Sequence, residues 1–218
     1  MKVYNCEQHD MDGNANPEWL DLRAGHFTGS DFNMYMGIAK TGKLSETAKK
    51  ELGKKVLECF GYRFDVYQTP AMLRGIELEP QAREAYSFIY GKDIKEVGFI
   101  DYEDMHAGCS PDGVIYDDNG KITEIVEIKC PLIETFVSYL DPEFMNPDYY
   151  IQCQFNMLIT GADVCHFVVY HPDFNLIVRD IPKDEEIQGK IRAVLEELTP
   201  MYDKLYERIN NKILEQGA

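Results

Sequence analysis

The sequence predicts an α/β (α+β) fold in which a central mixed β-sheet is flanked by helices. Three observations support this class. Segments rich in Val and Ile gather in the middle of the 218-residue chain, amphipathic segments lie on both sides of them, and no linker rich in Gly, Ser or Pro divides the chain. We therefore expect a single domain that spans residues 1–218.

Two short helices are predicted near the N-terminus. Asn16 and Pro17 have the residue types of an N-cap and a first helical position. The first helix should break at Gly25, and Ser30 or Thr28 could cap the second one.

The longer helices follow from caps and from apolar spacing. Ser45 should cap a helix in which Leu52, Val56 and Phe60 recur at four-residue intervals. Further helices are predicted at residues 75–91, which end at Gly91, at residues 148–161, which close with Gly161, and at residues 183–216, with a kink or break at Pro200.

Five segments have the composition of strands. They are residues 94–101, 113–116, 121–129, 165–171 and 175–182, and residues 117–120 have the composition of a turn between the second and the third.

The composition excludes several classes of protein. No apolar run is long enough to span a membrane, and the polar N-terminus lacks the apolar core of a signal peptide, so we expect a cytoplasmic protein. The six cysteines are scattered without a C-x-x-C pair, which argues against a disulfide framework and against a zinc or iron-sulfur site.

The net charge of -16 argues against a protein that coats nucleic acid nonspecifically, because phosphate binding relies on lysine and arginine. A local basic surface remains compatible with this charge. Residues 40–55 hold six lysines against two glutamates, which is either a solvated helix face or a contact for nucleic acid.

The predicted hairpin brings charged residues together. If Asn119 and Gly120 form a two-residue type I′ turn, Asp112 lies opposite Glu127, and Lys129 projects from the same face. A one-residue slip of the turn changes the partner of Asp112 but leaves the three charged side chains on one face.

This cluster indicates a chemistry. Two carboxylates held close together repel unless a proton or a cation lies between them. Oxygen ligands with no histidine nearby suit Mg²⁺ or Mn²⁺, and Lys129 could orient a bound water or remove its proton. The pattern therefore favours metal-assisted phosphodiester hydrolysis over a surface hairpin with a cross-strand charge pattern, because Asp112 directly follows Ser-Pro at the start of a strand.

These residues resemble the signature of the PD-(D/E)XK nuclease superfamily, in which Pro-Asp begins one strand and Glu-x-Lys occupies the next. Here they are Pro111, Asp112, Glu127 and Lys129. The stretch "GCSPDG…EIKCP" more closely resembles the phage lambda-type exonucleases, the YqaJ-like viral recombinase family, over most of the chain. The resemblance implies a restriction-endonuclease-like core.

The resemblance also implies a metal site. "RGIELEPQARE" is similar to a family helix whose glutamate, here Glu79, joins Asp112, Glu127 and Ile128 around the metal. Without the resemblance, Glu79 would only favour the dipole of a helix start. Some members carry a further acidic residue at the position of Tyr102, so a fourth carboxylate near that position stays open.

Two further motifs imply contacts with the substrate. "QCQFNMLITG" is similar to a Q-x-Q helix that would place Gln154 near the scissile phosphate, with Gln152 beside it. In "WLDLRAGHFTGSDF", Arg23 and Ser30 match residues that hold a terminal phosphate. The alternatives are that the two glutamines are ordinary polar residues on a partly exposed helix and that Arg23 only forms a surface ion pair.

The resemblance implies a Mg²⁺-dependent exodeoxyribonuclease that degrades one strand of linear duplex DNA, 5′ to 3′, in phage-type recombination. It would work in a bacterial host, encoded by a phage or prophage, beside a single-strand annealing protein and as a ring of three subunits. Two alternatives are a structure-selective endonuclease of the same superfamily and a non-catalytic module that binds DNA ends.

Overall fold

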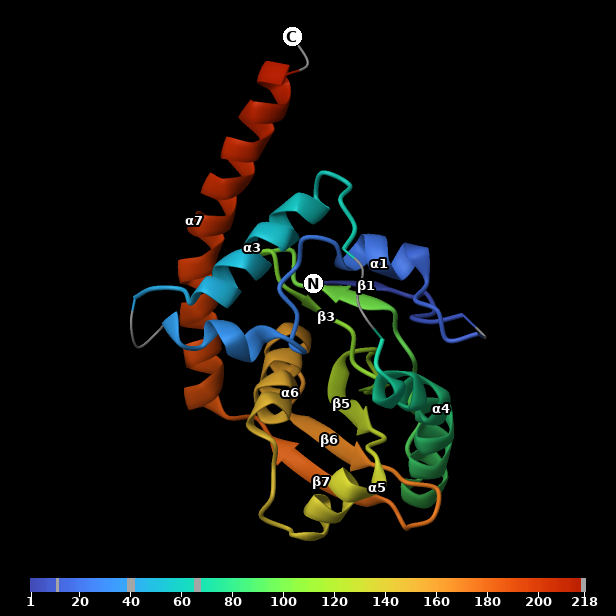
Figure 1. Ribbon diagram of the computed structural model, residues 1–218. Coiled ribbons are helices and arrows are strands. Elements are labelled where there is room, and N and C mark those ends of the chain that lie inside the picture. The colour runs from blue at the N-terminus through green and yellow to red at the C-terminus, as the bar shows by residue number, and fades with distance from the viewer. Residues whose placement is uncertain (11, 39–41, 65–67, 217–218) are drawn as a thin grey trace.

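The structure is a computed structural model that describes residues 1–10, 12–38, 42–64 and 68–216. Two β-sheets lie at its centre, and helices cover them (Figure 1). The larger sheet has the order β4-β5-β6-β7 and the smaller sheet the order β1-β2-β3. The predicted fold, a mixed sheet flanked by helices, is confirmed.

The four-stranded sheet holds the predicted hairpin. Its strands are β4 (Gly113–Tyr116), β5 (Ile122–Lys129), β6 (Val164–Val169) and β7 (Ile177–Pro182). Strands β5 and β6 run parallel, whereas the other two pairs are antiparallel. The parallel pair requires a crossover, and helix α6 (Pro147–Thr160) lies within it.

The smaller sheet differs more from the sequence prediction. It consists of β1 (Lys2–Tyr4), β2 (Phe99–Asp101) and β3 (Gly108–Cys109), and neither β1 nor β3 was predicted. The strand predicted over residues 94–101 is confined to its last three residues, and Lys95 forms an isolated bridge with Val114 instead.

The prediction of a type I′ turn is wrong. Only Gly120 of the two proposed turn residues has a positive φ, of 77°. The Asp117 N–H donates to the Lys121 carbonyl at 2.9 Å, and the Gly120 N–H donates to the Asp117 carbonyl at 3.0 Å. These bonds close a three-residue loop in which glycine occupies the left-handed position.

A bulge compensates for this longer loop. Tyr116 faces Ile122, whereas Ile115 faces Glu124, so Thr123 is an extra residue on β5. Beyond the bulge, Gly113 faces Val126, as the predicted register requires. The register at the charged end of the hairpin is therefore the predicted one, although the turn is not.

Most helices lie where the sequence predicted them. Asn16 caps α1 (Pro17–Arg23), and Ser45 caps α3 (Glu46–Glu58) by accepting from the Ala48 N–H at 3.1 Å. The other helical segments are η1 (Phe32–Tyr35), α4 (Pro70–Tyr90), α5 (Ile133–Phe136), η2 (Val137–Leu140), α6 and α7 (Glu185–Gln216).

Three helix predictions need correction. The N-cap position of η1 is Asp31, so neither Ser30 nor Thr28 caps this segment. Helix α4 begins at Pro70, capped by Thr69, five residues before the predicted start. Helix α7 continues through Pro200, so the predicted break does not occur, and the helix packs against α3 and α6.

Helices cover both faces of the large sheet (Figure 1). On one face, Leu78 and Ala82 of α4 pack against Val126 and Ile128 of β5. On the other face, α6 and α7 pack against a larger core that includes Ile125. The alternation along β5 therefore turns Glu127 toward α6.

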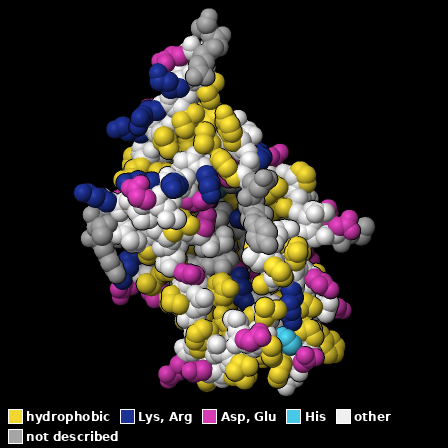
Figure 2. Space-filling view, viewed as in Figure 1, with side chains coloured by type: hydrophobic (Ala, Val, Ile, Leu, Met, Phe, Trp, Pro, Cys, Tyr) yellow, Lys and Arg dark blue, Asp and Glu magenta, His cyan; other side chains and the backbone are white. Residues whose placement is uncertain are grey.

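The second half of α7 extends beyond the sheets (Figure 1). Figure 2 shows Lys and Arg side chains gathered over this part of α7 and over α3. No helix within the described residues is long and apolar enough to cross a membrane.

Candidate active site

Glu127 lies at the centre of the candidate site. Its side chain is 1% exposed, and three donors surround it. Lys129 Nζ lies 2.6 Å and Gln152 Nε2 2.5 Å from Oε1, while Asn156 Nδ2 lies 3.2 Å from Oε2. Gln152 and Asn156 are four residues apart on α6, so one helix face supplies both amides.

Asp112 lies directly before β4 and is tied to β5. Its Oδ2 accepts a hydrogen bond from the Ile128 N–H at 2.6 Å. Its carbonyl accepts one from Arg83 Nε at 2.8 Å. The structure therefore brings Asp112, Glu127 and Lys129 together, as the hairpin register requires.

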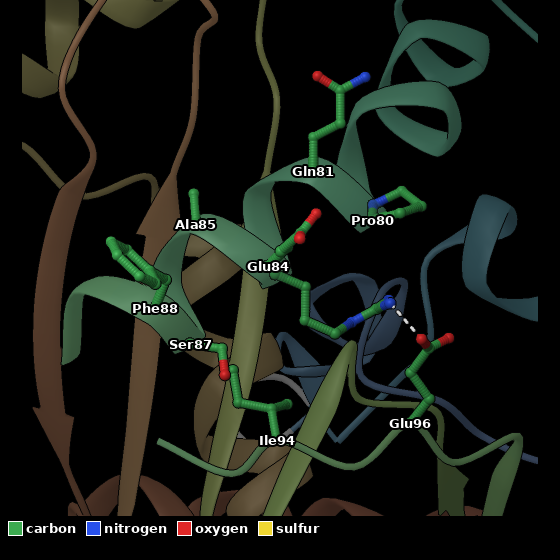
Figure 3. Close-up of a pocket in the computed structure, with 9 residues that line it drawn as sticks. Pro80, Gln81, Glu84, Ala85, Ser87, Phe88, Ile94 and Glu96 are labelled. Atoms are coloured by element: carbon green, nitrogen blue, oxygen red, sulfur yellow. Dashed lines mark ion pairs between the residues drawn. The ribbon is translucent and has the colours of Figure 1, made fainter. Parts of the chain in front are cut away.

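Glu79 reaches the same region from the middle of α4, not from a helix start. Its Oε1 lies 2.5 Å from Arg83 Nη2, one turn further along the helix. Arg83 also pairs with Glu96 at 2.5 Å, the ion pair drawn as a dashed line in Figure 3. The Arg83 guanidinium thus links α4 to the loop before β2 and to the backbone of Asp112.

The carboxylates perturb one another. Burial, together with the charge of Asp112, raises the pKa of Glu79 to about 8. Burial raises the pKa of Glu127 to about 7, although Lys129 opposes this rise. Burial also raises the pKa of Asp112. Burial alone would lower the pKa of Lys129, but the charges of Glu127 and Asp112 outweigh it and raise this pKa.

The donor set suits a hard divalent cation. Carboxylates whose charges raise one another's pKa values become ionised together when a cation lies between them. As they stand, no three His, Cys, Asp or Glu side chains within the described residues are close enough to hold a metal. Glu79 turns toward Arg83, and Asp112 toward the Ile128 N–H, which accounts for this separation.

The structure corrects the position expected for Gln154. Its side chain is fully buried on another face of α6, where Nε2 donates to the Pro182 carbonyl at 2.9 Å and Oε1 accepts from the Asp184 N–H at 3.0 Å. Gln154 therefore joins α6 to the start of α7. Gln152, predicted beside it, is the glutamine that contacts Glu127.

Arg23 and Ser30 lie close together through Thr28. Arg23 Nη2 lies 3.5 Å from Thr28 Oγ1, which lies 3.4 Å from Ser30 Oγ. Arg23 also donates to Ser110 Oγ at 3.2 Å and lies over the Trp19 ring at 4.5 Å. Within the described part of the chain, no carboxylate forms an ion pair with Arg23, so the alternative of a surface ion pair is wrong.

The segment with Thr28 and Ser30 packs directly on α6. A Cβ at Gly29 would lie 2.6 Å from Asn156 Oδ1 and 3.1 Å from the Gln152 carbonyl. Only glycine permits this approach. The segment that follows Arg23 therefore contacts the same helix residues, Gln152 and Asn156, that donate to Glu127.

A cavity of about 260 Å³ lies beside Asp112. Its described lining includes Glu79, Arg83, Asp112 and, from the N-terminal segment, His9. The expectation that no histidine lies near the carboxylates is therefore wrong. His9 is more than a hundred residues from Asp112 in the sequence, and no motif signals the contact.

A larger hollow of about 820 Å³ lies on the outer side of α4. Phe88, Ile94 and Glu84 are among the residues that line it (Figure 3). It shares Pro80, Arg83 and Glu96 with the smaller cavity, but Asp112 does not line it, so we do not assign the chemistry to it.

The region of Tyr102 lies elsewhere. The Tyr102 hydroxyl accepts a hydrogen bond from Arg192 at 3.2 Å, Asp101 faces His26 at 3.7 Å, and Glu103 pairs with the N-terminal amine. These contacts give no support to a fourth carboxylate from this segment.

The lysine cluster is divided in the structure. Lys49 and Lys54 are exposed and pair with Glu46 and Glu51 on α3. Lys55 is buried, 3.1 Å from Asp31. Lys40 lies outside the described residues. Part of the cluster is therefore a solvated helix face, whereas the buried Lys55 forms an internal ion pair of the fold.

Comparisons with known proteins identify the family of the chain. A model of the YqaJ-like viral recombinase domain matches residues 18–163. An alkaline exonuclease from Laribacter hongkongensis is 26% identical, with a TM-score of 0.79 over 92% of this chain and 100% of that chain, and it has also been solved with dAMP. A phage-related exonuclease from Haemophilus somnus 129PT is 22% identical, with a TM-score of 0.64 over 84% of this chain and 96% of that chain. No curated protein matches the sequence.

The raised pKa values predict how pH affects stability. Unfolding returns Glu127 and Glu79 to ordinary values near 4.5, so the metal-free protein should lose stability as pH rises from about 4.5 through about 8. A divalent cation that binds the ionised carboxylates should therefore raise the Tm more at about pH 8.5 than at about pH 6. Thermal unfolding with MgCl₂ and with EDTA measures both increments.

Glu127→Gln is the control for this prediction, because it keeps the shape but removes the titrating charge. It should shrink the Mg²⁺-dependent increment at the higher pH. An increment that depends neither on pH nor on Glu127 would contradict the assignment.

Proposed function

The chain belongs to the YqaJ-like viral recombinase family, as its motifs predicted, and from this membership we propose that it is a phage-type exonuclease that hydrolyses DNA. One observation carries the proposal. Lys129 Nζ lies 2.6 Å from the buried Glu127 carboxylate, at the end of β5 where the Ile128 N–H donates to Asp112. We further propose that residues 1–218 act as one nuclease domain.

The proposed cofactor is Mg²⁺, with Mn²⁺ as a substitute. Asp112, Glu127, Glu79 and the backbone carbonyl of Ile128 would hold it, and Glu79 would leave Arg83 to do so. When bound, the ion supplies Lewis-acid stabilisation of charge on the phosphate and lowers the pKa of water.

Lys129 acts as a cation and donor beside the reacting phosphate. Its raised pKa keeps it protonated while Glu127 and Asp112 carry charge. Neutralising the two carboxylates would remove the interactions that hold this proton, so Lys129 would release it to solvent more readily, and the neutral amine could then accept a proton from water. The Tyr149 ring, 4.8 Å from Lys129 Nζ, limits where the ammonium group can lie.

Gln152, rather than Gln154, takes the position near the scissile phosphate. Its amide already donates to Glu127, so it orients this carboxylate and lies where the phosphate must approach. Arg23 and Ser30 would hold a terminal 5′-phosphate, which fixes the end from which the strand is degraded.

The wider role follows the family. We propose degradation of one strand of linear duplex DNA, 5′ to 3′, beside a single-strand annealing protein in phage-type recombination. The place of action would be the cytoplasm of a bacterial host.

Lys129→Ala tests the chemistry. On linear duplex DNA labelled at one 5′ or one 3′ end, the variant should lose about 10²- to 10⁴-fold in rate, because a positioned proton-transfer group is lost. EDTA should stop the wild-type reaction, and the order of label release gives the polarity. Calorimetric titration with Mg²⁺ should show metal binding nearly intact in Lys129→Ala but lost in Asp112→Ala.

Closed circular duplex DNA is the control for end dependence. An exonuclease leaves it intact, whereas cleavage of the circle would replace the proposal with an endonuclease. A Lys129→Ala rate near that of the wild type would remove Lys129 from the mechanism.

Arg23 should set a preference for phosphorylated 5′ ends. A charge-assisted contact of about 1.5 to 3 kcal/mol predicts roughly a ten- to hundredfold higher initial rate on 5′-phosphorylated than on 5′-hydroxyl duplexes. Arg23→Ala should erase this preference. Arg63→Ala, which removes an exposed arginine paired with Asp21, is the matched control and should keep it. Equal wild-type rates on both ends would contradict the role.

A ring of three subunits would reconcile the net charge of -16 with DNA binding. The exposed lysines of α3, Lys49, Lys50 and Lys54, are the candidates to line its channel, whereas buried Lys55 is not. Analytical ultracentrifugation should show a trimer at micromolar concentration. A purely monomeric species with full nuclease activity would exclude the ring.

A further inference from the structure

The cavity beside Asp112 has an acidic lining. Its described carboxylates are Glu7, Asp10, Glu79, Glu96 and Asp112. A phosphodiester that enters such a cavity needs hydrogen-bond donors to offset repulsion. The donors that are not already engaged therefore decide where a phosphate can bind.

Most donor side chains of the cavity are already engaged. Arg83 uses Nε for the Asp112 carbonyl, Nη2 for Glu79 and Nη1 for Glu96. Gln8 Nε2 lies 3.0 Å from the Val97 carbonyl and 3.4 Å from the Pro111 carbonyl. Among the described residues, none forms a hydrogen bond with the ring nitrogens of His9, so His9 is the donor that remains.

His9 is held in place on both sides. The neighbouring Gln8 is fixed by its side-chain bonds and by its carbonyl, which accepts from the Asn16 N–H at 2.9 Å. The His9 backbone forms a bridge with Ala15. Its ring lies 5.5 Å from the Trp19 ring, over which Arg23 is also placed.

His9 therefore lies between the two parts of the site. Arg23, the proposed contact of the terminal phosphate, lies over the Trp19 ring. The cavity that His9 lines contains Asp112. The charges of both Asp112 and Arg23 act on the His9 ring. A strand that runs from Arg23 to Asp112 would pass this ring.

We propose that His9 donates a hydrogen bond to the first internucleotide phosphate of the strand being degraded, as a further substrate-contacting residue. This inference rests on the proposed nuclease function and extends it to a residue outside the family match, which begins at residue 18.

A neutral imidazole suits this position. It offers one N–H donor without adding a cation that the carboxylates of the cavity would capture. Burial lowers the pKa of His9, which favours the neutral ring. The contact orients the phosphate toward Asp112 while Arg23 holds the end of the strand.

Two variants separate the hydrogen bond from the ring. His9→Phe keeps an aromatic contact with Trp19 but removes the donor, whereas His9→Gln keeps an N–H donor. Fluorescence anisotropy in EDTA would measure binding of 5′-phosphorylated linear duplex DNA whose first linkage is either a phosphodiester or an uncharged methylphosphonate. Initial rates in Mg²⁺ on the phosphodiester duplex are the second measurement.

We expect His9→Phe to bind the phosphodiester duplex about tenfold more weakly and the methylphosphonate duplex within about twofold of the wild type. His9→Gln should retain most of the affinity for both. His9→Phe should also lose about tenfold in kcat/KM.

Equal affinity of His9→Phe and the wild type for the phosphodiester duplex would overturn the proposal. An equal loss on both duplexes would also overturn it, because that result indicates a structural role. A wild-type protein that binds the duplex but does not cut it refutes the nuclease function, and the binding comparison still decides the role of His9. A wild-type protein that does not bind linear duplex DNA refutes both.

Discussion

The burial of Glu127 is the constraint on which the rest of the site depends. A carboxylate with 1% exposure is costly in a fold unless donors surround it, because its hydration is lost. Lys129 supplies a charged donor from the same strand, and Gln152 and Asn156 supply two amides from α6. The packing of α6 on the sheet and the ionisation of Glu127 are therefore coupled.

The side chains of β5 alternate between the two faces of the sheet and so contact two different helices. Val126 and Ile128 pack under α4, while Glu127 between them faces α6. Asp112 accepts a hydrogen bond from the Ile128 N–H, which connects the start of β4 to the end of β5. Glu79 reaches the same region from α4, where it forms an ion pair with Arg83. The charged groups converge where β4 begins and β5 ends, because Glu79 of α4 lines a cavity with Asp112 and the amides of α6 contact Glu127.

Charge is distributed unevenly over this acidic molecule. Basic side chains gather over α3 and the extended part of α7 (Figure 2), whereas the cavity beside Asp112 is lined mainly by carboxylates. An anionic polymer would thus be attracted by one surface and repelled at the proposed reaction site unless the carboxylates were neutralised. The few hydrogen-bond donors near that site, Arg23 and His9 among them, therefore matter for where an anion can bind.

The sequence by itself determined the local features: the helix capped by Ser45, the strand of Glu127 and Lys129, and the family, since these depend on neighbours along the chain. Only the tertiary structure decided which side chains meet. Gln152 contacts Glu127 and Gln154 does not, because the packing of α6 on the sheet sets which face of the helix is turned toward Glu127. The tertiary structure also brought His9 to the cavity, since a contact across more than a hundred residues leaves no period or spacing in the sequence.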